Sequence, residues 1–72
     1  MPKLPSLKPR QVVHALERAG FYQARQRGSH LQLKKGNRLV TVPMHAGDVN
    51  PSTLRSIIRQ AQMTVDEFVA LL

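Results

Sequence analysis

The 72-residue sequence is short enough for one domain, so we expect residues 1–72 to fold as a single unit. It contains no cysteine, which excludes disulfides, thiolate zinc sites and thiol catalysis. Eleven Lys and Arg residues against four Asp and Glu give a formal net charge of +7, which favours an anionic partner such as nucleic acid, an acidic protein or anionic lipid.

Residues 1–8 contain two prolines and are expected to be extended before a first helix. Pro9 opens this helix, since proline suits the first helical turn. Gly20 is expected to cap its C-terminus. Apolar residues recur between them at helical spacing, at Val12, Val13, Leu16 and Ala19.

Three strands are predicted next, over residues 21–27, 30–34 and 38–42, joined by turns at 28–29 and 35–37. Pro43 ends the third strand, because proline cannot donate to a sheet ladder. The alternation of the first strand is imperfect: Phe21 has the same parity as the basic residues at its other end. A bulge is therefore expected within it.

Asn50 is expected to cap a second main helix that begins at Pro51. Its apolar residues form one face, at Leu54, Ile57, Ile58 and Ala61. Thr64 and Glu67 have the spacing of a capping box, which predicts a short C-terminal helix. The apolar side of that helix is expected to comprise Val65, Phe68, Val69 and Leu72.

The element order predicts an α+β fold, an α-β-β-β-α two-layer sandwich with a short C-terminal helix. The strands form an antiparallel meander with the helices on one face and the other face open. This is the layout of double-stranded-RNA-binding domains. If Leu31 and Leu33 point into the core, His30, Gln32 and Lys34 point out together onto the open face.

His30 is the principal candidate for chemistry, because an imidazole with a pKa near 6.5 can act as general acid or base near neutrality. RNA is cleaved without metal when its own 2′-OH attacks in line, which needs such a group and nearby cations. Arg25, Arg27 and Arg38 are candidates for charge stabilisation. Lys34, about 13 Å along the strand, suits a neighbouring phosphate.

Two residues are candidates for supporting roles, Ser29 beside His30 and His45 in the loop after the third strand. His45 could approach His30 or could instead form a loop hydrogen bond. A metal site on the two histidines is not expected, since Asp48 is the one nearby carboxylate. With one Tyr and two Phe, RNA contact is expected mainly through phosphate and sugar.

Several segments together resemble the HicA toxins, also called YcfA-like mRNA interferases. The matching segments are Gly20-Phe21, Arg25-Gln26-Arg27-Gly28-Ser29-His30, Val42-Pro43-Met44-His45 and residues 53–61. The resemblance implies a fold like that of double-stranded-RNA-binding domains, cleavage of mRNA with His30 as the catalytic histidine, and a HicB antitoxin partner. The chain departs from the family at Ser52 and Gln62, where the family more often has Gly.

Residues and resemblance together predict the toxin of a toxin–antitoxin pair, a metal-independent endoribonuclease without cofactors that inhibits translation. Its expected partners are RNA and the antitoxin, in a hetero-oligomer. No apolar run approaches the roughly 20 residues of a membrane span, and the N-terminus lacks a secretory signal, so a cytoplasmic location is expected. The alternative is a non-catalytic RNA- or DNA-binding module that uses the same basic face.

Overall fold

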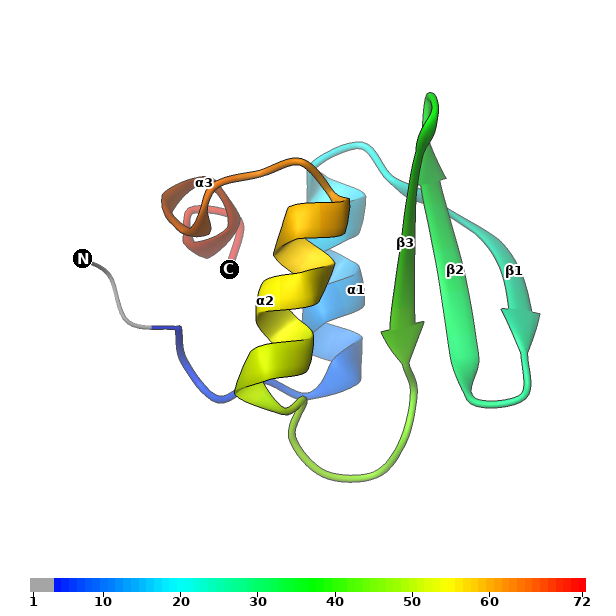
Figure 1. The fold of residues 1–72 in the computed structure, drawn as a ribbon, viewed down its shortest axis with the longest axis horizontal. Helices are drawn as coiled ribbons and strands as arrows, with labels where there is room; N and C mark the ends of the chain where they lie inside the picture. Colours follow the sequence, from blue (N-terminus) through cyan, green and yellow to red (C-terminus); the bar gives the residue numbers. More distant parts are fainter. Residues whose placement is uncertain (1–3) are drawn as a thin grey trace.

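The structure, a computed structural model, describes residues 4–72. Its elements follow the predicted order and are shown in Figure 1. They are α1 (Pro9–Arg18), β1 (Tyr22–Arg27), β2 (His30–Lys35), β3 (Arg38–Pro43), α2 (Pro51–Gln60) and α3 (Val65–Val69). Of the segment expected to be extended, residues 1–3 lie outside the described part and residues 4–8 form neither helix nor strand.

The three strands form an antiparallel sheet in the order β1-β2-β3, so the predicted meander is confirmed. Two-residue turns join the strands, and each begins with a glycine of positive φ, Gly28 at 59° and Gly36 at 61°. A first turn position of this kind favours glycine, because L side chains are strained there.

The expected bulge is present in β1, where the register against β2 shifts between Gln23 and Arg25. The extra residue reverses the alternation of the strand. Phe21, just before β1, therefore lies in the core, while Arg25 and Arg27 lie on the opposite face with the outward residues of β2. By the same shift, Tyr22 pairs with Lys34 and shares that outward face.

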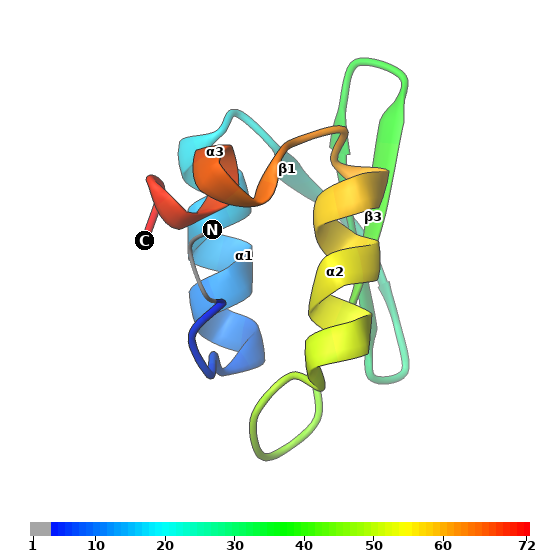
Figure 2. The same ribbon diagram turned by 60° about the vertical axis from the view of Figure 1, so that its left-hand side comes forward.

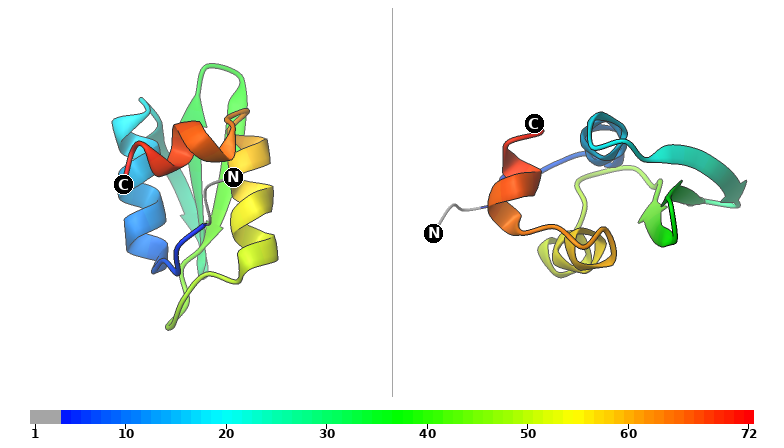
Figure 3. Two further views of the ribbon diagram at one scale, coloured as in Figure 1. Left: turned by 90° about the vertical axis from the view of Figure 1, so that its left-hand side faces the viewer. Right: turned by 90° about the horizontal axis from the view of Figure 1, so that it is seen from above.

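The helices α1 and α2 cover the inner face of β2 and β3, and α3 crosses them on the side away from the sheet (Figures 2 and 3). Figure 1 shows β1 farthest from the helices, and all six of its residues are exposed. One hydrophobic cluster fills the interior; its largest fully buried side chains are Phe68, Leu16, Leu33, Leu54 and Ile57. The chain thus has the α+β fold of double-stranded-RNA-binding domains.

Both main helices end in the same backbone motif. In α1, the N–H of Gly20 donates to Glu17 O and that of Phe21 to Leu16 O. In α2, the N–H of Gln62 donates to Arg59 O and that of Met63 to Ile58 O. This is the Schellman arrangement, which requires a left-handed residue after the helix cap.

Glycine supplies that residue in α1, with φ of 101°, whereas in α2 Gln62 adopts φ of 58°. The backbone of Gln62 therefore has a left-handed conformation, which glycine would adopt without strain.

Some boundaries and one core assignment differ from the sequence prediction. β1 begins at Tyr22 rather than Phe21, while β2 and β3 each extend one residue further, to Lys35 and Pro43. The prediction that Leu72 belongs to the apolar side of the last helix is wrong. α3 ends at Val69, and Leu72 is exposed while Leu71 packs against the core.

Within residues 4–72, none of the helices combines the length and the apolar character that crossing a membrane requires.

Candidate nucleic-acid interface

The open face of the sheet is organised in rows of three residues, one from each strand. Directly paired residues of antiparallel strands project their side chains to the same face, about 5 Å apart at Cα. From one end of the sheet to the other, the rows are Arg27-His30-Pro43, Arg25-Gln32-Thr41 and Tyr22-Lys34-Leu39. The opposite face presents Leu31, Leu33, Val40 and Val42 to the core.

His30 occupies the centre of the first row, as the first residue of β2 directly after the Gly28-Ser29 turn. Its side chain is exposed, and Arg27 and Pro43 are its neighbours across the two strand pairs. The tight turn fixes where β2 begins, so it also fixes which face His30 occupies. The sequence-based placement of His30 opposite Leu31 and Leu33 is confirmed.

Arg25 and Lys34 lie on the same face as His30 at increasing distances. Arg25 belongs to the next row, whose β2 member Gln32 is two strand positions from His30, or about 7 Å along the strand. Lys34 is four positions away, about 13 Å, in the third row. Both side chains are exposed. The face therefore presents a line of cations leading away from the histidine.

Arg38 does not join this group. It pairs with Lys35 at the far end of the sheet and projects to the helix side, where its Nη1 donates to Ala61 O at 3.4 Å. Lys35 behaves similarly: its Nζ donates to Ala19 O at 2.6 Å. The two cations thus lie at the carboxyl ends of α2 and α1, where they complement the helix dipoles. The expectation that Arg38 acts beside His30 is not supported.

The loop after β3 begins next to His30. The N–H of Met44 donates to Ser29 O, which extends the pairing of β2 and β3 by one step. His45 follows, exposed, with its Nδ1 2.9 Å from Ala46 O. A carbonyl can only accept, so the Nδ1–H tautomer of His45 would donate to Ala46 O and leave Nε2 directed elsewhere. Ser29 and His45 thus lie at the His30 end of the sheet.

The sheet is cationic throughout. Its strands contain Arg25, Arg27, Lys34, Lys35 and Arg38 and no acidic residue, while the four acidic residues of the chain lie in helices and loops. Among the described residues, no group of three or more His, Asp or Glu side chains is arranged to hold a metal ion.

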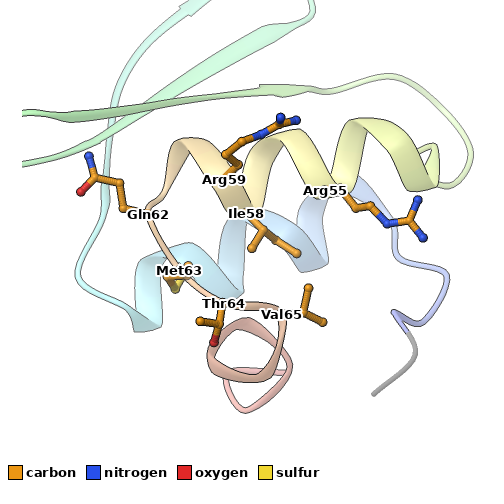
Figure 4. A pocket seen from close by; sticks show the side chains of 7 residues that line it. All are labelled: Arg55, Ile58, Arg59, Gln62, Met63, Thr64 and Val65. Atoms are coloured by element: carbon orange, nitrogen blue, oxygen red, sulfur yellow. The ribbon is translucent and has the colours of Figure 1, made fainter. Parts of the chain in front are cut away.

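A second surface feature lies on the helix side of the molecule, away from the open face of the sheet. It is a shallow hollow between α2 and the start of α3 (Figure 4). Ile58, Met63 and Val65 contribute apolar walls, and Arg55 and Arg59 come from the exposed side of α2. The Nη2 of Arg59 donates to Ser56 Oγ at 3.2 Å. The hollow adds no group to the His30 site.

Tyr22, for which the sequence predicts no role, lies on the open face in the same row as Lys34. The signal was present in the imperfect alternation of residues 21–27. Once a bulge separates a buried Phe21 from outward-facing arginines, the residue after Phe21 must face outward too.

A comparison with curated proteins found no match. The sequence model of the HicA toxins of bacterial toxin–antitoxin systems matches residues 9–63, from the first residue of α1 to the residue before the α3 cap. The match covers more than half of the chain and includes the whole sheet with His30. With the observed fold and the cationic face in agreement, the match shows that the chain belongs to the HicA toxin family and is the toxin partner of a cognate antitoxin.

Proposed function

We propose that this toxin is an endoribonuclease that cleaves mRNA in the cytoplasm and so inhibits translation, with His30 as the general acid or base. The observation that supports this best is the position of His30, exposed on the open face and directly paired with Arg27. An imidazole beside a guanidinium combines a group that transfers a proton with a fixed positive charge. Cleavage through the RNA's own 2′-OH needs both.

In this reaction the 2′ oxygen attacks the adjacent phosphorus, the 2′ proton passes to a base, and the 5′ oxygen leaves with a proton from an acid. His30 can take either role, which contributes about 10²–10⁴-fold to the rate. Arg27, and Arg25 in the next row, are positioned to stabilise the negative charge that develops on the phosphate oxygens. His45, at the same end of the sheet, is the candidate for the second proton-transfer role, and Ser29 for substrate contact.

We further propose that cleavage requires no metal ion. The strands present no carboxylate, and carboxylate oxygens are the ligands that Mg²⁺ and Ca²⁺ prefer. Arg25 and Arg27 would supply the positive charge that a metal ion supplies in other nucleases.

The antitoxin is proposed to neutralise the toxin in a hetero-oligomer by lying over the open face. A net charge of +7 and a sheet free of acidic residues favour an acidic partner surface. Contacts to Arg25 and Arg27 would cover His30 at the same time. A structure of the complex in which His30 remained open to solvent would contradict occlusion.

The decisive experiment compares His30→Ala with His14→Ala. His14 is a matched control, since it is also an exposed histidine, on α1 and outside the sheet. Each protein is induced in bacteria, and growth and the integrity of a reporter mRNA are followed at equal protein level. Wild type and His14→Ala should arrest growth and degrade the message, and His30→Ala should do neither.

The same proteins then distinguish catalysis from binding in vitro. His30→Ala should lose cleavage while keeping its affinity for RNA and the salt dependence of that affinity. Loss of a phosphate contact such as Arg27 should instead flatten the slope of log K against log salt by roughly 0.7 units for a single strand. Growth arrest by both wild type and His30→Ala with intact mRNA would show that the basic face acts by binding alone.

A further inference from the structure

Two large apolar side chains are exposed in one row of the open face. Tyr22 is 58% exposed and Leu39 is 44% exposed, and both are paired directly with Lys34, one from each side. The row is thus an aromatic ring, an ammonium group and an aliphatic side chain in line across the sheet. Neither apolar residue belongs to the hydrophobic core cluster.

The bulge in β1 causes the exposure of Tyr22. Without the bulge between Gln23 and Arg25, Tyr22 would share the inner face of the sheet with the core residues of β2. With the bulge, its ring stands on the outer face beside Lys34. An aromatic ring that is more than half exposed gains little from burial, so its position suggests that it contacts a ligand.

We propose that the Tyr22-Lys34-Leu39 row is a nucleobase subsite for the RNA that is cut at His30, an inference that rests on the proposed function. The Tyr22 ring stacks on a base, Lys34 contacts an adjoining phosphate, and Leu39 packs against the apolar face of the sugar or base. Base stacking on an aromatic side chain tolerates any base, since every base has a π-face. The subsite therefore positions the strand without specifying its sequence.

Two observations favour RNA over a protein as the occupant. The row lies on the same face as His30, about 13 Å from it along β2, so different nucleotides of one strand can occupy the two places. Between them the face presents Arg25 and Gln32 and no acidic residue. The line of cations leads along the sheet to an exposed aromatic ring. This arrangement matches a polymer in which phosphates and bases alternate.

The sequence offers an internal probe for this proposal, because Tyr22 is the only tyrosine and there is no tryptophan. Intrinsic tyrosine fluorescence of the protein therefore reports on Tyr22 alone. The experiment uses the full chain with His30→Ala, which prevents cleavage, and titrates it with an RNA octamer or with inorganic polyphosphate. Polyphosphate supplies the same type of charge without bases.

The RNA octamer should quench the Tyr22 emission at saturation, after correction for absorption by the RNA. Polyphosphate should bind with a similar dependence on salt and leave the emission unchanged. Equal quenching by the two polyanions, or none by RNA that is shown to be bound, would overturn the stacking proposal.

Substitutions give an independent measurement. Tyr22→Ala should weaken binding of the RNA octamer roughly 5- to 150-fold, the range expected for one stacked base. Tyr22→Phe keeps the ring and should retain the affinity. Leu72→Ala is the matched control, since Leu72 is 45% exposed at the other side of the molecule, beyond α3, and it should have no effect.

Kinetics on chains that retain His30 separate this proposal from the proposed function. Tyr22→Ala should lower kcat/KM for a long RNA without abolishing cleavage, which loss of a proton-transfer group would do. If wild type does not cleave but RNA still quenches Tyr22, the ribonuclease proposal is wrong and the base subsite stands. If Tyr22→Ala leaves RNA affinity unchanged but weakens binding of the antitoxin, the row is a protein-docking surface and the subsite is wrong.

Discussion

Gly28 and Gly36 form a natural matched pair for testing the link between turn geometry and activity. Each is the first residue of a two-residue turn, with φ of 59° and 61°, and a methyl group added to either meets no atom within 4 Å. The cost of Gly28→Ala or Gly36→Ala is therefore conformational rather than steric, about 1–2 kcal/mol for an L residue with positive φ. The two variants should be destabilised equally.

Their effects on activity should differ, because only one turn borders the proposed catalytic residue. Gly28 precedes His30 by two residues, whereas Gly36 lies at the other end of β2, about 20 Å away. Since a 1 Å displacement of a catalytic group can cost about 10²-fold, Gly28→Ala should lower RNA cleavage roughly 10- to 100-fold. Gly36→Ala should leave cleavage close to wild type.

The assay combines thermal unfolding by circular dichroism with cleavage of a labelled RNA at a temperature where both variants are folded. For a domain of this size, the expected destabilisation lowers Tm by about 4–16 °C in each variant. D-alanine in place of Gly28, introduced by chemical synthesis, prefers positive φ and should restore both stability and cleavage. Equal losses of cleavage in the two alanine variants, or none in Gly28→Ala, would refute the assignment of the active end of the sheet.

Four further predictions concern the helices. Gln62→Gly should stabilise the protein by about 0.5–1 kcal/mol in urea unfolding, because it relieves a left-handed φ at the end of α2; a destabilised variant would contradict this. Thr64→Ala should cost about 1 kcal/mol near neutral pH, since the Thr64 hydroxyl accepts from the Glu67 N–H and caps α3. Hydrogen bonding from Thr64, first by its backbone N–H and second by its hydroxyl, holds the pKa of the Glu67 carboxyl below its usual range. The resulting stabilisation is present above the ordinary glutamate pKa of about 4.3 and is lost as the pH falls through the folded-state value, so Glu67→Gln should flatten that acid limb. Phe68→Ala should cost about 3–5 kcal/mol, which would unfold most of the protein, because the ring is fully buried; half-buried Val65→Ala should cost much less in the same urea titration.

Local signals in the sequence were sufficient to predict most of the fold. Short stretches of neighbouring residues predict the order of elements, the helix caps at Asn50 and Thr64, and the bulge in the first strand. Strand pairing followed because short turns leave antiparallel neighbours as the only arrangement. His30 was placed on the open face by simple alternation with Leu31 and Leu33.

Two features could not be predicted from local patterns, the partner of Arg38 and the residue at which α3 ends. Arg38 has the same parity as Val40 and Val42, so alternation alone puts it on the helix side, but the partner of its guanidinium there, Ala61 O at the end of α2, is a tertiary contact. Leu72 continues the helical spacing of Phe68, but α3 ends at Val69 and Leu72 is exposed. The carbonyl that Arg38 reaches depends on where α2 packs against the sheet, which no local pattern encodes.

The two edges of the sheet bear on how the toxin behaves when it accumulates without its partner. Exposed strand edges invite pairing with other chains, and aggregation can follow. On β3 the N–H of Thr41 donates to Gln60 Oε1 of α2 at 3.1 Å, so a helix side chain occupies part of that edge. On β1 the exposed edge carries Arg25 and Arg27, which would oppose like charges if two copies paired. The cations proposed to bind RNA would thus also discourage self-association, and replacing both with neutral residues should make the isolated toxin prone to oligomerise.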